Sequence, residues 1–354
     1  MEHPRIEWFA DPAVLAPIAL MVWIYVRRLR QVRREAGARE GAAREADARE
    51  GAAREAGARE GFPREAGARE GSPREADARE GSPREAGARE GAPREAGARV
   101  GAAREGGGRE GGGAVRGAGP LQALAFGGAV LALLTALVSP IDGLGSDYLF
   151  SAHMVQHVLL GDIAPLLLLL SLSRVIMRPA TRRLARVEKA LGPLASPWTA
   201  IAVWLGTMYA WHIPAIYDAA AQHALLHALE HASFFAAGVA LWWPLIQPVP
   251  MRNSLTGMQP LAYIALAKGG LAALGLFLAW SSTAHYPWYE DTPRIWGLDP
   301  VEDQNVAGVI MMVEQSLTLV LVLVWVFVRM LARSEQEELR RERLEDAQVA
   351  ALDG

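Results

Sequence analysis

The sequence predicts an all-α integral membrane protein with seven transmembrane helices, and three observations support this prediction. Seven apolar segments reach or approach the ~20 residues that a helix needs to cross the hydrocarbon core of a bilayer. Clusters of arginine follow alternate segments. An Arg/Glu/Ala/Gly repeat at residues 34–113 explains why the mean hydropathy is only +0.11 although 51% of the residues are hydrophobic.

The order of the segments also predicts their orientation. The apolar segments are 13–29, 121–140, 149–173, 198–216, 223–247, 260–281 and 305–331. Basic clusters follow the first, third and seventh segments, at Arg27 to Arg34, Arg174 to Lys189 and Arg329 to Arg341, whereas the loop after the fifth contains only Arg252. The remaining loops are acidic or neutral apart from Arg294. Because cytoplasmic loops carry the excess of Lys and Arg, we expect the N-terminus outside and the C-terminus in the cytoplasm.

The first segment is expected to be retained in the mature protein. Acidic residues precede it, at Glu2, Glu7 and Asp11, and arginines follow it. A cleavable signal peptide has the opposite arrangement, with its positive charges before the apolar stretch. The first segment is therefore predicted to be a membrane helix.

The repeat is predicted to be a low-complexity cytoplasmic insertion, flexible or transiently helical. Arginine recurs every five residues from Arg34 to Arg109, usually followed by Glu. A five-residue step turns a helix by ~140°, so the arginines collect on no single face, and little that is apolar and larger than Ala is present to build a core. The predicted domains are residues 1–31 with the first helix, the insertion at 32–119, a six-helix membrane core at 120–333 that contains the histidines, and a charged cytoplasmic tail at 334–354.

Charge and cysteine content exclude several classes of function. The formal net charge is −3, and Arg and Glu alternate rather than forming a basic face, so no nucleic-acid partner is expected. The chain has no cysteine, which excludes disulfides, thiolate metal sites and cysteine nucleophiles. Any metal must be bound by His, Met, carboxylate or backbone oxygen.

The histidines form the most informative pattern. His153 and His157 are one helical turn apart, as are His223, His227 and His231, and His212 ends the fourth segment. The predicted topology places all of them toward the outer side of the membrane. Imidazoles on neighbouring helices suit copper, zinc, iron or nickel, and the presence of methionine without cysteine favours copper. The predicted metal ligands are His153, His157, His212, His223, His227 and His231, with Met154, Met208 and His285 as possible supporting residues.

Ionisable residues within the apolar segments allow two interpretations. Asp162, Lys268 and Glu314 are costly in a bilayer unless they are paired or functional. They are interpreted either as a structural ion pair or as a polar floor below the histidines that relays a proton or ion. Glu230, one turn from His227, is a candidate acceptor for an imidazole N–H in the second coordination shell.

Two further features are weaker. His227, Glu230 and His231 match the H-x-x-E-H pattern of a class of zinc peptidases, but the match is short. The outer loop at 281–304 is aromatic and acidic, which is typical of an interfacial belt and also suits attraction of a cation or a basic partner.

An ordered set of motifs resembles the multi-span CtaG-type cytochrome c oxidase assembly proteins of bacteria. The motifs are S-A-H-M-V-Q-H-V-L-L at 151–160, A-W-H-I-P-A-I-Y-D-A-A at 210–220, H-A-L-L-H-A-L-E-H-A-S-F-F-A-A-G at 223–238, W-W-P at 242–244 and E-D-Q-N-V-A-G-V-I-M-M at 302–312. The resemblance covers residues ~120 to 331 and has no counterpart for the repeat.

The resemblance implies a multi-pass plasma-membrane protein that takes part in the maturation of haem–copper oxidases by handling copper. The six histidines fall on the family's histidine motifs. We therefore expect a non-enzymatic assembly factor whose partners are an oxidase subunit and membrane lipid. The sequence makes no prediction about the number of subunits. A haem-binding membrane cytochrome and a copper transporter are the alternatives.

Overall fold

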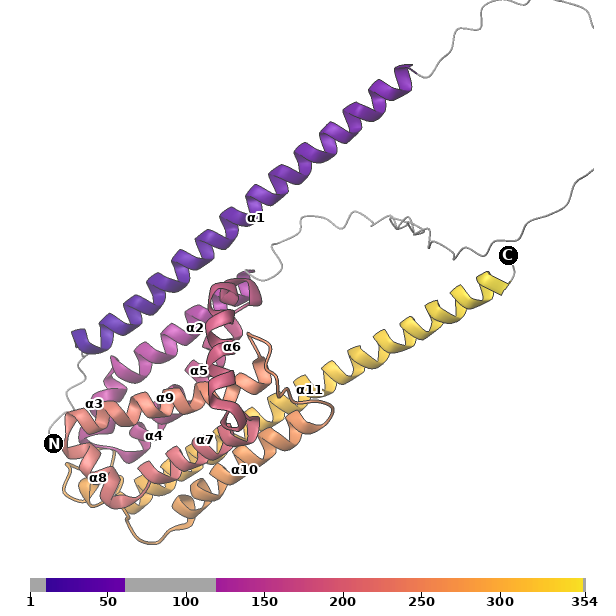
Figure 1. Ribbon diagram of the computed structural model, residues 1–354. Helices are drawn as coiled ribbons and strands as arrows, with labels where there is room; N and C mark the ends of the chain where they lie inside the picture. The colour runs from indigo at the N-terminus through magenta and orange to yellow at the C-terminus, as the bar shows by residue number, and fades with distance from the viewer. Residues whose placement is uncertain (1–10, 61–118, 353–354) are drawn as a thin grey trace, which may run out of the picture. The chain divides into compact units, whose positions relative to one another are not determined.

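The computed structural model describes residues 11–60 and 119–352, and in these ranges it is helical without a strand, as predicted (Figure 1). Of the described residues, 11–36 and 119–352 belong to one unit, and the packing described below is within it. Its elements are α1 Pro12–Glu60, α2 Pro120–Leu137, α3 Pro140–Asp147, α4 Phe150–Val158, η1 Leu159–Ile163, α5 Ala164–Ser171, α6 Arg174–Leu191, η2 Gly192–Leu194, α7 Pro197–Trp211, α8 Pro214–Gln222, α9 Ala224–Ile246, α10 Gln259–Trp280, η3 Pro287–Tyr289 and α11 Pro300–Leu352.

Six helices in the described ranges are long and apolar enough to cross a membrane. They are α1, α2, the continuous stretch Phe150–Ser171, α9, α10 and α11. The predicted fourth segment contains α7, which has 15 residues and ends at Trp211, and Pro214 then begins the separate helix α8. Fifteen residues extend ~22 Å, less than the ~30 Å of the hydrocarbon core. The total of seven spans and their orientation therefore stay predictions.

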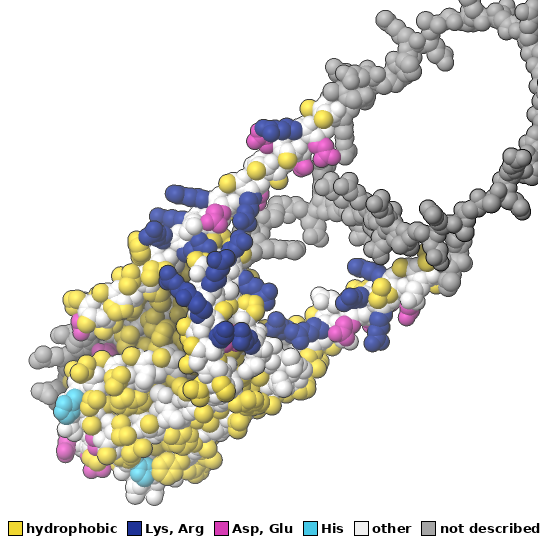
Figure 2. All heavy atoms as spheres, in the orientation of Figure 1, with side chains coloured by type: hydrophobic (Ala, Val, Ile, Leu, Met, Phe, Trp, Pro, Cys, Tyr) yellow, Lys and Arg dark blue, Asp and Glu magenta, His cyan; other side chains and the backbone are white. Residues whose placement is uncertain are grey.

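The surface and the interior have the distribution of polarity expected of a membrane protein. Large apolar side chains are exposed, including Leu121, Leu225 and Trp280, and Figure 2 shows an extensive apolar surface over the bundle. Charged side chains such as Glu230 and Lys268 are buried. A helix in lipid satisfies its own backbone and turns apolar side chains outward, so this chain is a helical membrane protein.

The span formed by α4, η1 and α5 occupies the centre of the bundle, where it packs against α2, α9 and α11. Its middle section, η1, is a π-helical turn. Pro165 has no N–H to donate to the carbonyl of Gly161 four residues earlier, which is a common cause of an interrupted helical ladder. The Cα of Gly238 on α9 lies against that same carbonyl, so closely that a Cβ would collide with it. α9 is therefore held close to the central span.

Close helix contact also joins α10 to α11. A Cβ on Gly308 would collide with the backbone of Ala279, and one on Gly275 would lie 3.1 Å from the Gly308 carbonyl. Small residues allow two helices to approach in a membrane, where van der Waals packing drives association. Around these contacts, the aromatic side chains of Trp204, Trp242 and others fill the core.

Two helices extend beyond their predicted apolar segments. α1 includes the first part of the repeat, where the side chains from residue 37 to 53 are exposed and Arg49 forms a 2.6 Å ion pair with Glu45. Ala, Arg and Glu are strong helix formers, which explains this extension without a packed core. The rest of the repeat, from residue 61, lies outside the described residues. α11 continues through the predicted tail, whose described side chains are exposed.

Candidate metal centre

Two helices bring four of the predicted histidines together. His153 and His157 are on α4, with ring centroids 4.3 Å apart, and His227 and His231 are on α9, 4.2 Å apart. Across the two helices, the ring centroids of His153 and His227 are separated by 5.3 Å. Because four residues complete slightly more than one turn, each pair projects from one face of its helix. The two pairs face each other.

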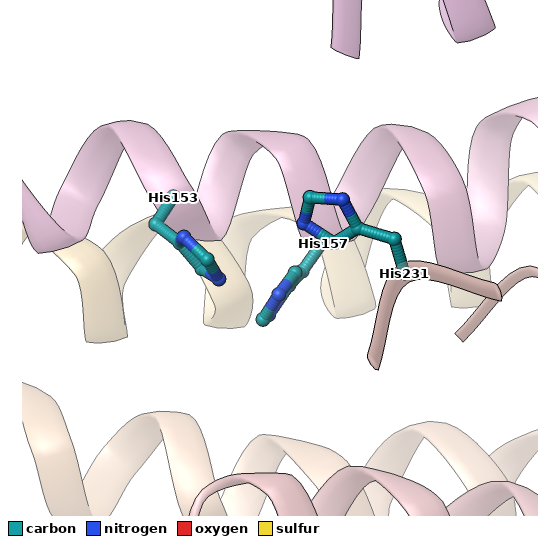
Figure 3. A group of neighbouring side chains, drawn as sticks. All are labelled: His153, His157 and His231. Atoms are coloured by element: carbon teal, nitrogen blue, oxygen red, sulfur yellow. The ribbon is translucent and has the colours of Figure 1, made fainter. Parts of the chain in front are cut away.

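Three of these rings are arranged so that their nitrogens converge. One ligand atom from each of His153, His157 and His231 lies within 4.8 Å of the other two, and Figure 3 shows His231 reaching from its own helix toward the two rings on α4. A second group with the same property consists of His153, His227 and Glu230. Two nitrogens bound to one ion at ~2.0 Å each lie no more than ~4 Å apart. Small side-chain movements would therefore bring these ligand atoms into contact with a single ion.

The imidazole nitrogens in this group are buried without hydrogen-bond partners among the described residues. This is true of both ring nitrogens of His153 and His157 and of Nε2 of His227 and His231. Most buried polar side-chain atoms are paired, and each exception requires an explanation such as an ion or water. Several buried nitrogens without a hydrogen-bond partner are thus directed at one another.

Glu230 supplies the negative charge of the group. Its side chain is only 1% exposed, and Oε1 lies 3.4 Å from Nε2 of His157 and 3.8 Å from Nε2 of His153. A buried carboxylate requires a positive partner, which protonated imidazoles or a bound cation would provide. In this position Glu230 can accept from an imidazole N–H, as predicted, or bind an ion directly.

His212 joins the group from the end of α7. Its Nδ1 lies 2.7 Å from the Met208 carbonyl oxygen, which only an N–H can approach at that distance, so Nδ1 is the protonated nitrogen. Nε2 of the neutral ring is then free to accept, and it lies 3.4 Å from the sulfur of Met154. Met154, Met208 and Met311 line a cavity of about 20 Å³ beside His157 and His212, so thioether sulfur adjoins imidazole nitrogen.

The structure does not bring His223 or His285 into the group. His223 is exposed and precedes the first residue of α9 in an extended conformation, so it leaves the stripe that His227 and His231 share, and its Nδ1 contacts the Ala219 carbonyl at 2.9 Å. His285 contacts the Ser281 hydroxyl at 2.7 Å and stacks on Phe277. Five of the six predicted histidines therefore converge.

Sequence reasoning missed an aromatic cover over the group. Tyr217 on α8 has its ring 5.2 Å from that of His153, and its hydroxyl is 2.8 Å from the Tyr289 hydroxyl. Tyr289 donates to the Gly145 carbonyl, and Tyr286 donates to the His212 carbonyl at 3.2 Å. Burial raises the pKa of Tyr286 and of Tyr289, so both hydroxyls stay protonated as donors. The loop at 281–304, expected to be an interfacial belt or to attract a cation or a basic partner, therefore packs against the end of α7 and against Tyr217 through Tyr286 and Tyr289.

One acidic residue of that region has a structural role. Asp303 accepts from the backbone N–H groups of Phe150 and Ser151, at 2.6 and 3.2 Å, and from the Ser151 hydroxyl. It therefore satisfies free donors at the start of α4, as a capping carboxylate does. This capping role could not be predicted from the sequence, because Asp303 and the start of α4 are more than 150 residues apart. Asp303 holds the helix that carries His153 and His157.

A second polar group lies in the same bundle, around Lys268. Its ammonium contacts the carboxylates of Asp162 and, at 3.3 Å, Glu314, and lies between the rings of Trp204 and Trp242 at 5.5 and 5.4 Å. Glu314 also accepts from the hydroxyl of Thr318 at 2.6 Å and from the amide of Gln315. The predicted pairing of Lys268 is thus present, with both carboxylates.

The fold and the site define a helical membrane protein that buries a histidine-rich group under an aromatic cover. The family model of the cytochrome c oxidase caa3 assembly factor matches residues 107–333, and the chain belongs to this family, as its motifs suggested. No curated protein and no solved structure matches the chain. The family's role in assembling cytochrome c oxidase also indicates an oxidase as partner.

Proposed function

We propose that this protein binds copper at the buried histidine group and delivers it to a haem–copper oxidase during assembly. The observation that carries the proposal is the convergence of His153, His157 and His231, whose buried ring nitrogens include five that have no hydrogen-bond partner in the described part of the chain. Imidazole nitrogen with nearby thioether sulfur suits copper in either oxidation state. Copper here is the cargo of the protein, and no substrate turnover is proposed.

The route of delivery follows from the predicted topology. With the N-terminus outside, the histidine group lies in the outer half of the plasma membrane, beneath the loop that contains Tyr286 and Tyr289. Copper enters and leaves on that side by ligand exchange, and movement of the loop opens the path. The neighbouring sulfurs of Met154 and Met208 offer replacement ligands while the imidazole bonds break.

The test compares two single substitutions in the full chain. Removing a proposed copper ligand by His157→Ala is expected to lower copper affinity by more than ~100-fold, beyond the loss typical when a residue that only hydrogen-bonds to a ligand is changed. His223→Ala is the matched control, because His223 is exposed and outside the group. Competition with a copper chelator measures affinity in purified protein, and oxidase activity measures delivery in cells. Equal copper binding by both variants and the parent would refute the site.

A bound haem is the alternative that the same preparation tests. The rings of His153, His157, His227 and His231 contact one another directly, so a macrocycle would have to separate α4 from α9. We therefore expect a reduced-minus-oxidised absorbance spectrum without a haem band. A haem band that disappears in His157→Ala would show that the histidine group binds haem and would refute the copper proposal.

A further inference from the structure

A basic pocket lies far from the histidine group, where several helices end. It has a volume of about 280 Å³ and lies between the start of α6, the end of α9, the loop before α10 and the last apolar turns of α11. Three arginines line it: Arg174, Arg329 and Arg333. Figure 2 shows Lys and Arg side chains gathered at this end of the bundle, whereas exposed histidines lie toward the other end.

The three arginines have no acidic partner among the described residues. Arg329 and Arg333 are one turn apart on α11, an arrangement in which like charges repel. The guanidinium of Arg329 lies over the ring of Trp325, with 4.5 Å to the ring centroid, which directs it along the helix surface. An anion bound between the three arginines would relieve this repulsion.

The remaining lining matches the chemistry of phosphate. Ser254 and Thr256 contribute hydroxyl groups, of which that of Thr256 also contacts Gln259 Oε1 at 3.4 Å. Gln247, the left-handed residue that ends α9, contributes an amide that donates one N–H to the Pro244 carbonyl at 3.0 Å and has a second N–H for a ligand. Arginine binds phosphate oxygens in a bidentate manner, and hydroxyl groups add further donors. The acidic side chains of the described residues do not line this pocket.

An apolar slot on the other side of Pro244 distinguishes a lipid from a free anion. Pro244 lines both the basic pocket and a neighbouring cavity of about 300 Å³. That cavity is walled mainly by apolar side chains of α6, α7 and α9, including Leu184, Val203 and Trp243. A phosphate site beside an apolar slot, at the end of membrane helices, has the two parts that an amphiphile requires.

We infer that this pocket binds the phosphate of an anionic phospholipid, with the arginines on the headgroup and an acyl chain in the apolar slot. The predicted topology places the pocket in the cytoplasmic leaflet, where anionic lipids and basic pockets between helices meet. The site is separate from the histidine group, so it holds whether or not the protein carries copper.

The test uses the full-length protein in nanodiscs that contain phosphatidylcholine with or without phosphatidylglycerol. The pocket variant is Arg174→Gln/Arg329→Gln/Arg333→Gln. The matched control, Arg182→Gln/Arg183→Gln/Arg186→Gln, removes the same charge from exposed positions of α6 that do not line the pocket. Native mass spectrometry counts retained lipid, and thermal unfolding measures stabilisation. We expect the pocket variant to bind phosphatidylglycerol at least ~10-fold more weakly, since basic residues near an anionic surface strengthen its attraction.

Three outcomes would overturn the inference. Equal losses in the pocket variant and in the control would indicate diffuse attraction to a charged surface. Retention of phosphatidylcholine as strong as that of phosphatidylglycerol would show that the headgroup charge is not recognised. Stabilisation by millimolar inorganic phosphate in phosphatidylcholine nanodiscs, equal to that by the lipid, would identify a free anion as the ligand. An unchanged helical circular dichroism spectrum of the pocket variant verifies that it is folded.

Discussion

The histidine group and the Lys268 network are both buried and polar, but they differ in how their atoms are paired. Lys268 contacts two carboxylates, and Glu314 accepts from Thr318 and Gln315 as well. In the histidine group, both ring nitrogens of His153 and His157 lack a hydrogen-bond partner among the described residues. A buried polar network that satisfies its own members stabilises a fold, whereas a group of unpaired donors and acceptors requires a ligand. The contrast favours a structural role for the Lys268 network and supports the proposed ligand-binding role of the histidine group.

The largest effect on stability is expected in the Lys268 network. Lys268→Met leaves the carboxylates of Asp162 and Glu314 facing each other without a cation, and breaking a buried ion pair costs ~3–5 kcal/mol. Thermal unfolding in detergent should show this loss. Adding Asp162→Asn and Glu314→Gln removes the uncompensated charges and should restore most of the stability. A triple variant that stays folded but has lost copper affinity or oxidase activity would instead support the relay interpretation of these residues.

A substitution at Gly238 should separate the two regions. Gly238→Val forces α9 away from the Gly161 carbonyl, and overpacking of this kind costs ~1–3 kcal/mol. The histidine group draws ligands from both α4 and α9, whereas Asp162, Lys268 and Glu314 are on η1, α10 and α11. The loss of copper-binding free energy should therefore be larger than the loss of free energy of unfolding. Gly269→Ala on α10, with nothing within 4 Å of the added methyl group, is the control that should leave both unchanged. Similar copper affinity in Gly238→Val and Gly269→Ala would contradict the idea that the packing of α9 against Gly161 positions the histidine group.

The smallest of these effects is expected from the charge of Glu230. Glu230→Gln keeps the shape of the side chain and removes the negative charge near His153 and His157. A second-shell change of this kind typically lowers metal affinity by ~10–100-fold, so chelator competition should show a loss smaller than that of His157→Ala. The matched control is Gln222→Glu, which adds a charge at an exposed position just before α9. If Glu230→Gln binds copper as the parent does, Glu230 has no part in the site.

The histidine pattern shows what spacing can and cannot predict. One-turn spacing correctly placed His153 with His157 and His227 with His231 on common helix faces, because helical geometry is local. The same spacing wrongly extended the stripe to His223, since α9 begins one residue later. The encounter of the two pairs depends on Pro165, Gly161 and Gly238, whose contact joins segments more than 70 residues apart. No period within one segment contains that information.

The fold class and the family could be predicted from the sequence alone, because apolar length, the absence of cysteine and ordered motifs are properties of the chain itself. The short length of α7 was harder to predict, since residues 198–216 are apolar on both sides of the break before Pro214. Tertiary structure decided which polar residues pair with each other and which are left unpaired. Pairing depends on distances between helices, and those distances result from side-chain packing that a one-dimensional pattern does not contain.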